Sequence, residues 1–152
     1  MTNIQKICRK CGGYCCSLGG TVATKIEFNE IIKTGYNNYF VRISDNCYIT
    51  EWGETGICPY FKEYYCTIYE VRPMVCKKFP VFSLNSKEHY LMHCPLTSHL
   101  SEKEKEECIA LATQIPDETL DRINDYLDPY GEIIEKRMNK FEMTPIDLKQ
   151  GT

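Results

Sequence analysis

The chain has 152 residues, ten of them cysteine, and a formal net charge of −3. This length suits one domain with a moderate core, and 43% hydrophobic residues exclude an intrinsically disordered chain. The net negative charge provides no global positive field, so we expect no nucleic-acid partner.

The N-terminal residues lack the apolar stretch of a secretory signal peptide, and no run of about 20 apolar residues occurs. We therefore expect a cytoplasmic protein with no membrane partner. Disulfides are rare in this reducing compartment, whereas metal ligation is an ordinary use of cysteine there. The ten cysteines consequently indicate metal binding rather than a disulfide framework.

The first half is predicted to contain a loop, a helix and a β-region. Paired glycines interrupt regular structure, so residues 1–20 are predicted to form a loop. Thr24 and Glu27 match a capping box and predict a helix over Lys25–Lys33, with Gly35 as its stop. A β-region follows over residues 39–69, and its expected features are a hairpin turn at Gly53–Gly56, a return strand at Ile57–Phe61 and a turn at Lys62–Glu63.

The second half is predicted to be mainly helical. Pro73 can open a short helix that ends before Pro80. Further helices are expected at Glu102–Gln114, Asp117–Leu127 and Tyr130–Asn139, and the tail after Thr144 is expected to be frayed. The expected fold class is α+β, with a small irregular cysteine-rich β-region and metal-binding loops covered by several α-helices. We expect a single domain over residues 1–152, with a cysteine-cluster metal-binding part at 1–98 and a helical part at 99–143.

The first cysteine cluster has the spacing of a metal site. Cys8 and Cys11 are separated by two residues, which can bring both sulfurs to one tetrahedral ion. Gly12 can take positive φ, letting the chain fold around a metal and direct N–H groups at sulfur. Cys15 and Cys16 follow within five residues. Because neighbouring side chains point apart, they indicate two sites, a bridged multinuclear site, or one ligand beside one packed thiol.

A closed site needs four ligands, and four later cysteines can complete it: Cys58, Cys66, Cys76 and Cys94. Zinc and iron–sulfur clusters both accept four thiolates. The Cys58-Pro59 and Cys94-Pro95 steps slightly favour an iron–sulfur cluster, and zinc stays as the alternative. Arg72 is predicted to contact the cofactor, because its guanidinium can reach a sulfur and a backbone carbonyl together and offset thiolate charge.

These cysteine segments resemble the CxxCxxCC-type cysteine-cluster proteins (the YkgJ-like family). The resemblance rests on Cys8-x-x-Cys11-x-x-x-Cys15-Cys16, on Cys58-Pro59-Tyr60-Phe61, on the segment from Cys66 to Pro80 and on Cys94-Pro95. That family is described as a zinc- or iron-chelating domain, and a similar cysteine module occurs in flagellin lysine-N-methylases. The resemblance implies eight metal ligands: Cys8, Cys11, Cys15, Cys16, Cys58, Cys66, Cys76 and Cys94.

The other candidate ligands are expected to be structural. Cys108 lies on the apolar stripe of its helix and is predicted to pack in the core, and Cys47 is predicted to be an ordinary thiol. His93 adjoins Cys94, but the thiols are expected to supply the ligands.

The predicted function is that of a metal-binding protein with an accessory, redox or metal-stabilised interaction role. Its expected partners are a metal ion or cluster and, in the interaction role, another protein. No nucleotide loop, nucleophile elbow or other catalytic motif is found, which argues against an enzyme. The alternative is an iron–sulfur enzyme or a methyltransferase-linked protein resembling the cysteine module of the flagellin methylases.

Overall fold

The computed structural model describes residues 3–11, 16, 21–51, 57–128, 131–139 and 141–147. The α-helices in these ranges are α1 (Asn3–Cys11), α2 (Lys25–Lys33), α3 (Met74–Lys77), α4 (Glu102–Thr113), α5 (Asp117–Leu127) and α6 (Gly131–Met138). The strands are β1 (Val22–Ala23), β2 (Phe40–Ser44), β3 (Cys47–Thr50), β4 (Phe61–Lys62), β5 (Tyr65–Cys66), β6 (Val81–Ser83), β7 (His89–Met92) and β8 (Met143–Pro145). The predicted α+β class is confirmed. No helix in the described ranges is long and apolar enough to cross a lipid bilayer.

Local capping signals position the predicted helices. The Thr24 hydroxyl accepts from Glu27 N–H and the Glu27 carboxylate accepts from Thr24 N–H, which forms a complete capping box at α2. Ser101 and Glu104 form the same arrangement at α4. The bounds of α2 and α5 are those predicted. Gly35 follows α2 with a φ of 105°, a backbone conformation that glycine adopts without a steric cost.

Residues 3–11 form a helix, α1, so the prediction of a loop over residues 1–20 is wrong for this part; residues 12–15 and 17–20 lie outside the described residues. Ile7, Cys8 and Cys11 lie on one face of α1 and pack against the buried residues Met92, Cys94 and Leu96. An apolar face of this kind stabilises a helix through tertiary packing. The prediction gave the glycines too much weight, because they follow the helix in the sequence.

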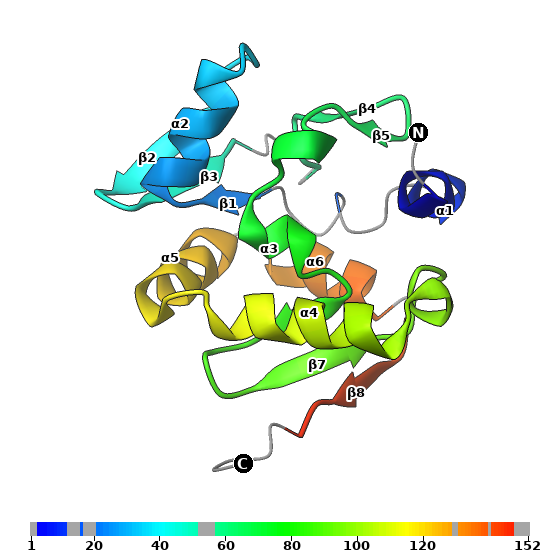
Figure 1. Cartoon of the computed structure of the whole chain (residues 1–152). Helices are drawn as coiled ribbons and strands as arrows, with labels where there is room; N and C mark the ends of the chain where they lie inside the picture. Colours follow the sequence, from blue (N-terminus) through cyan, green and yellow to red (C-terminus); the bar gives the residue numbers. More distant parts are fainter. Residues whose placement is uncertain are drawn as a thin grey trace.

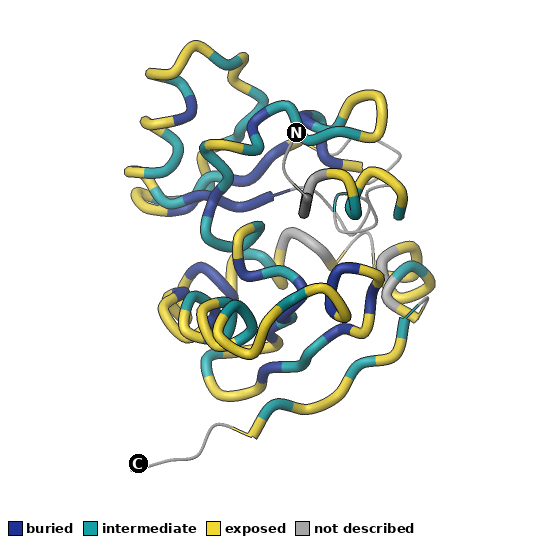
Figure 2. Tube along the Cα trace, turned by 45° about the vertical axis from the view of Figure 1, so that its right-hand side comes forward, coloured by how far each residue is buried: buried dark blue, intermediate teal, exposed yellow. Residues whose placement is uncertain are grey.

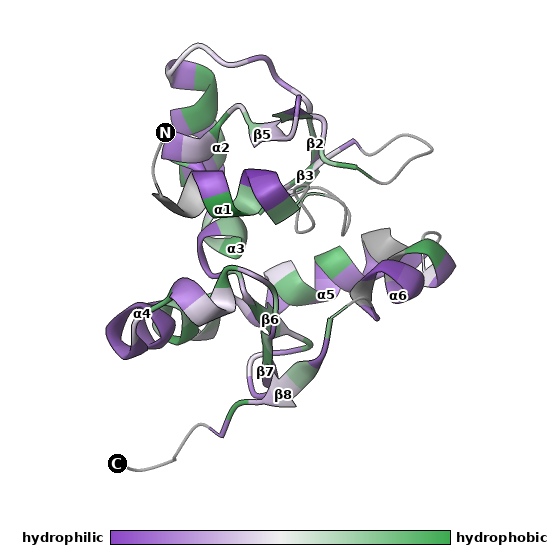
Figure 3. Cartoon of the chain, turned by 90° about the vertical axis from the view of Figure 1, so that its right-hand side faces the viewer, coloured by the Kyte–Doolittle hydropathy of each residue, from purple (hydrophilic) through white to green (hydrophobic). Residues whose placement is uncertain are grey.

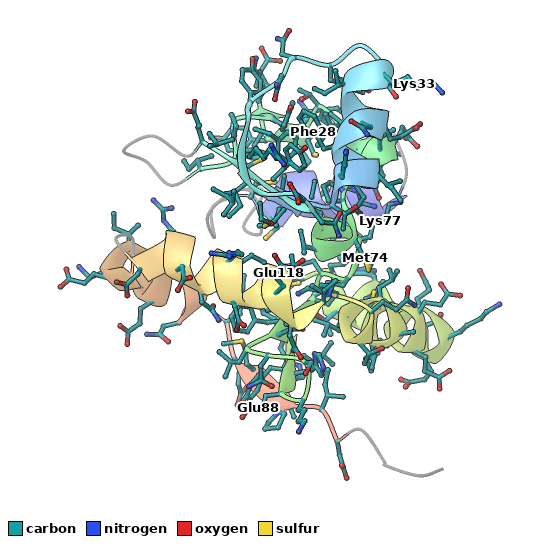
Figure 4. The ribbon with its side chains drawn as sticks, turned by 90° about the vertical axis from the view of Figure 1, so that its left-hand side faces the viewer. Phe28, Lys33, Met74, Lys77, Glu88 and Glu118 are labelled. Atoms are coloured by element: carbon teal, nitrogen blue, oxygen red, sulfur yellow. The ribbon has the colours of Figure 1, made fainter. Side chains whose placement is uncertain are left out.

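The first sheet has the antiparallel order β1-β3-β2. Strands β2 and β3 pair with each other through the turn at Asp45–Asn46, with Val41 opposite Ile49. The predicted return strand at Ile57–Phe61 is therefore wrong, and the predicted turn at Gly53–Gly56 lies outside the described residues. Helix α2 covers this sheet, and Phe28 stacks on Tyr48 with ring centroids 4.2 Å apart (Figures 1 and 4).

The hairpin of β4 and β5 turns at Glu63 and Tyr64, one residue later than predicted. Both residues have positive φ, at 52° and 61°, which matches a two-residue turn whose twist suits paired strands. The hairpin places Cys66 opposite Phe61.

The last sheet has the antiparallel order β6-β7-β8. Strand β8 pairs with β7, with Leu91 opposite Thr144, and Ile146 N–H donates to His89 O. The predicted fraying after Thr144 is thus wrong for residues 145 and 146, and residues 148–152 lie outside the described residues. The strand was missed because its pairing depends on a partner far away in the sequence.

The elements form two regions, with α3 between them (Figure 1). One contains α2, the first sheet and the β4–β5 hairpin, and the other contains α4, α5, α6 and the last sheet. Helix α3 contacts β1 and α4. Buried stretches run along the strands, whereas the outer faces of α4 and α5 are exposed (Figure 2). Helix α4 is mostly hydrophilic, as expected for a helix at the surface (Figure 3).

Glu27 joins α2 to α3, and its loss is expected to destabilise the fold. One carboxylate oxygen accepts from Thr24 N–H at 3.0 Å, and the other accepts from Met74 N–H at 2.5 Å. Glu27→Gln replaces one acceptor with a donor, so one half-buried backbone N–H loses its partner. We expect the free energy of unfolding to fall by about 2 kcal/mol in urea unfolding. Exposed Glu30 on the same helix provides the control, Glu30→Gln, and equal losses for both variants would contradict the role of Glu27.

Candidate metal centre

The first cysteine group joins α1 to the end of β7. Cys8 and Cys11 are three residues apart, so they share a face of α1. Both are half-buried and pack against the cluster that contains Cys94, which is 7% exposed. The sequence separates Cys11 from Cys94 by more than 80 residues, and the packing of α1 brings them into one neighbourhood. We call Cys8, Cys11 and Cys94 the helix group.

Thr97 holds the loop that carries Cys94. The Thr97 hydroxyl donates to Met92 O at 2.5 Å and accepts from Cys94 N–H at 3.2 Å. Since its only proton is directed at Met92 O, this hydroxyl can only accept from the Cys94 thiol, whose Sγ lies 3.5 Å away. The two backbone bonds of Thr97 do not involve the Cys94 thiol proton, so they fix the loop that carries Cys94 independently of its sulfur.

The second cysteine group lies beside the β4–β5 hairpin. Cys58 is buried in a cluster with Ile31, Tyr60 and Ile68, and Cys16 and Cys66 pack against that cluster. Cys58 N–H donates to Cys16 O at 2.9 Å, and Phe61 N–H donates to Cys58 O at 3.0 Å. These bonds fix the backbone on both sides of Cys58. We call Cys16, Cys58 and Cys66 the hairpin group.

The side chain of Tyr60 packs beside Cys58 and is fixed by two hydrogen bonds. Its hydroxyl donates to Asn37 O at 2.5 Å and accepts from Tyr39 N–H at 3.2 Å. Burial raises the pKa of Tyr60, and negative charge on the nearby Cys58 adds to this increase. The phenol therefore stays protonated beside Cys58 and keeps its donor bond to Asn37 O.

Cys76 lies on α3 and belongs to neither of these packed clusters. Its sulfur is 2.9 Å from the hydroxyl of Thr21, which is 1% exposed. The neighbouring Lys78 is also buried, and its ammonium donates to Val81 O at 2.6 Å. Burial lowers the pKa of Lys78 to about 8, and the charges of Cys76 and Cys108 oppose this shift. A thiolate at Cys76 would thus have a hydroxyl donor and a nearby cation.

Arg72 contacts a backbone carbonyl, as the reach of its guanidinium group suggested. Its Nε donates to Tyr69 O at 2.9 Å, and its guanidinium lies 3.8 Å from the centre of the Tyr69 ring. Its positive charge opposes the rise that burial causes in the pKa of Cys108, a cysteine outside the predicted ligands. Contact between Arg72 and a cofactor stays a prediction.

The two cysteines outside the predicted ligand set lie where the protonated thiol is favoured. Burial raises the pKa of Cys47, which packs with Val22 and Ile49, so its thiol keeps its proton. Burial also raises the pKa of Cys108, and Glu107 and Glu104 add to the effect. Because the thiolate is the metal-binding form, these pKa shifts agree with the expectation that Cys47 and Cys108 are not ligands.

Two of the three histidines, His89 and His93, make hydrogen bonds away from the cysteines. His89 is 2% exposed, and its ring nitrogens contact the Ser83 hydroxyl at 2.7 Å and Ser86 O at 3.0 Å. Exposed His93 contacts the Thr144 hydroxyl at 2.6 Å. These contacts hold the last sheet together.

The nine cysteines in the described ranges are thiols, and Cys15 lies outside those ranges. We expected four sulfurs around one centre, but no three histidine, cysteine, aspartate or glutamate side chains of the described residues form a metal-holding group. The helix group is nevertheless not remote from the hairpin group, because α1 contacts β5, the strand that carries Cys66. The ligand set therefore stays a prediction, supported by the packing of six of its members.

A family model described as "CxxCxxCC: Putative zinc- or iron-chelating domain" matches residues 7–109. The matched stretch makes up more than half of the chain, begins in α1 and ends in α4. It contains both cysteine groups and Cys76. A search of curated proteins and a search of solved structures each gave no match.

Proposed function

The chain belongs to the CxxCxxCC family, and we propose that it holds zinc or an iron–sulfur cluster through a multi-cysteine site. The proposed ligands are Cys8, Cys11, Cys15, Cys16, Cys58, Cys66, Cys76 and Cys94. The observation that carries the proposal is the packing of Cys8 and Cys11 against the cluster around Cys94. This packing brings thiols that are far apart in the sequence into one neighbourhood, which supports a shared site.

The donor chemistry supports zinc or iron–sulfur over other metals. Sulfur ligands select zinc, copper(I) and iron–sulfur clusters, whereas magnesium and calcium prefer oxygen. The Glu27 carboxylate, which contacts α3, is occupied by backbone N–H groups. An all-thiolate site is the arrangement that the cysteine-rich donor set favours.

The proposed role is that of an accessory, redox or metal-stabilised interaction protein. A bound metal would tie α1 to the rest of the molecule, since four thiolates crosslink segments that are far apart in sequence. Arg9 and Lys10 on the exposed side of α1 could offset part of the thiolate charge.

Elemental analysis of anaerobically purified protein tests the proposal. We expect iron or zinc in a fixed ratio to the chain, with a brown colour if the site holds an iron–sulfur cluster and no colour if it holds zinc. Cys11→Ser should lower the metal content, and Cys108→Ser serves as the matched control because that thiol is outside the family pattern. Purified protein that contains neither metal, and that binds none when reduced and supplied with it, would refute the function.

A further inference from the structure

We propose that residues 141–146 form a strap that closes one side of the buried cluster around Cys94 and limits how fast reagents in solution reach its thiol. The strap contains β8 and lies beyond the residues that the family model matches, so family membership does not account for it. The inference concerns access to Cys94 and does not depend on whether a metal is bound there.

The strap lies along β7 in a continuous antiparallel register (Figure 1). Met143 is opposite Met92, the last residue of β7. Two further steps in the same register place Phe141 beside Cys94. Opposite residues of an antiparallel pair share a face of the sheet, so the Phe141 ring lies on the side of the strap where Cys94 is buried.

Backbone hydrogen bonds attach both ends of the strap. At one end, His93 N–H donates to Glu142 O at 2.8 Å, and at the other end Ile146 N–H donates to His89 O at 2.9 Å. The first of these bonds lies beyond the end of β7 and carries the pairing up to the residue before Cys94. The cover over Cys94 is therefore held in register.

The side chains of the strap alternate between the cluster and the solvent. Phe141 and Met143 are half-buried and pack against the buried cluster that contains Cys94, whereas Glu142 and Thr144 are exposed. Successive side chains of an extended strand point to opposite faces, which explains the alternation. Two apolar side chains thus supply the cover at this end of the strap.

The position of β8 suits local opening. The strand has three residues and lies at the edge of its sheet, where it pairs with β7 alone. Pro145 has no N–H group and cannot donate to a ladder. Segments with few buried apolar contacts open at a lower free-energy cost than the core does. Opening of the strap therefore does not require the rest of the last sheet to separate.

The loop that carries Cys94 does not depend on the strap. Thr97 holds this loop through its bonds to Cys94 N–H and Met92 O, and Phe79 and Leu100 pack against the same cluster from outside the strap. When the strap opens, these contacts remain. Opening therefore uncovers Cys94 in a loop that keeps its conformation.

Alkylation of individual thiols tests the strap. Reduced, metal-free, full-length protein is treated with iodoacetamide, and the alkylation rate of each cysteine is followed by mass spectrometry. Phe141→Ala/Met143→Ala removes the apolar cover, so we expect Cys94 to react about tenfold faster than in the wild type. Glu142→Ala changes the outward face of the same segment and should leave the rate as it is. A Cys94 rate that is the same in the double variant and the wild type would overturn the inference.

Two other buried cysteines distinguish local opening from a general loss of stability. Cys47 and Cys58 lie in clusters that contain no strap residue, so both should react at their wild-type rates in the double variant. Equal acceleration of Cys47, Cys58 and Cys94 would show that the strap supports the whole fold rather than covering one thiol, and would overturn the inference.

A measurement on the wild type needs no substitution. At urea concentrations below the unfolding transition, we expect Cys94 alkylation and hydrogen exchange over residues 141–146 to accelerate together while Cys47 stays unreactive. Reaction of Cys94 and Cys47 only together, at the unfolding transition, would overturn the strap. The metal content of the purified protein is not involved in either measurement, so failure of the strap and failure of the proposed function are distinguishable.

Discussion

Under the proposed metal-binding function, removing the metal is expected to abolish hydrogen-exchange protection in α1 and to weaken it in the β4–β5 hairpin, while α4 and α5 stay protected. Helix α1 has nine residues, and isolated helices shorter than about 12–15 residues are marginal in water. A structural zinc site contributes roughly 10–16 kcal/mol of apparent binding free energy in small peptides. That contribution far exceeds what the single apolar face of α1 can supply.

The packing sets the boundary of the affected region. Ala112, Ile115 and Leu120 are buried without any cysteine ligand beside them in the sequence, so α4 and α5 keep their core in the metal-free protein. Strand β7 should also keep protection, because Met92 packs with Phe79, Phe141 and Met143 as well as with the cysteines. The residues that lose hydrogen-exchange protection are thus expected to be those that contact the cysteines in space, wherever they lie in the sequence.

Hydrogen exchange measured by mass spectrometry on metal-loaded and metal-free protein checks this result. Cys11→Ser should reproduce the loss in α1, and Cys108→Ser should not. Equal protection of α1 with and without metal would mean that packing alone holds the helix, and that the cysteines do not stabilise the fold.

Lys78→Met is expected to stabilise the metal-free protein by about 2 kcal/mol at pH 7. Lys78 is buried, and burial lowers its pKa from 10.5 to about 8. Below pH 8 the amine is charged in both the folded and the unfolded chain, so folding bears the full cost of burying the charge. A pKa shift of this size means that burying the charge costs about 3 kcal/mol, which the methionine side chain avoids. The variant also loses the hydrogen bond to Val81 O, which costs it about 1 kcal/mol, so the net stabilisation is about 2 kcal/mol.

The pH dependence has a definite sign. Between about pH 8 and 10.5 the folded chain releases the proton of Lys78 while the unfolded chain retains it. The unfolded state then binds more protons, so this residue makes the free energy of unfolding rise with pH in that window. The advantage of Lys78→Met over the wild type should therefore shrink as the pH rises above 8.

Urea unfolding of wild type and variant at matched pH values from 7 to about 9 measures both effects. Exposed Lys77 on the same helix provides the control, because Lys77→Met removes a charge that is already in water (Figure 4). A difference between wild type and Lys78→Met that stays constant across the window would show that charge burial at Lys78 is not its cause.

The helices predicted correctly have their signals close in sequence. Thr24 with Glu27 and Ser101 with Glu104 act within one turn, so the starts of α2 and α4 can be recognised without tertiary information. Helix α1 was missed because its apolar face includes Cys8 and Cys11. Those residues were interpreted only as ligands, although a half-buried cysteine also packs as a small apolar side chain.

Spacing and residue type by themselves predicted a set of thiols suited to zinc or iron–sulfur, and the family resemblance placed Cys47 and Cys108 outside it. Only the tertiary structure decided which of these thiols pack in one cluster. Cys94 joins Cys8 and Cys11 because α1 packs on the end of β7, and β7 in turn pairs with β8 from the far end of the chain. The predicted division at residue 98 stays a prediction, although the last sheet takes strands from both sides of it. The spacing of nearby residues reflects local backbone geometry. Which distant cysteines come close to one another depends on long-range packing, which that spacing does not encode.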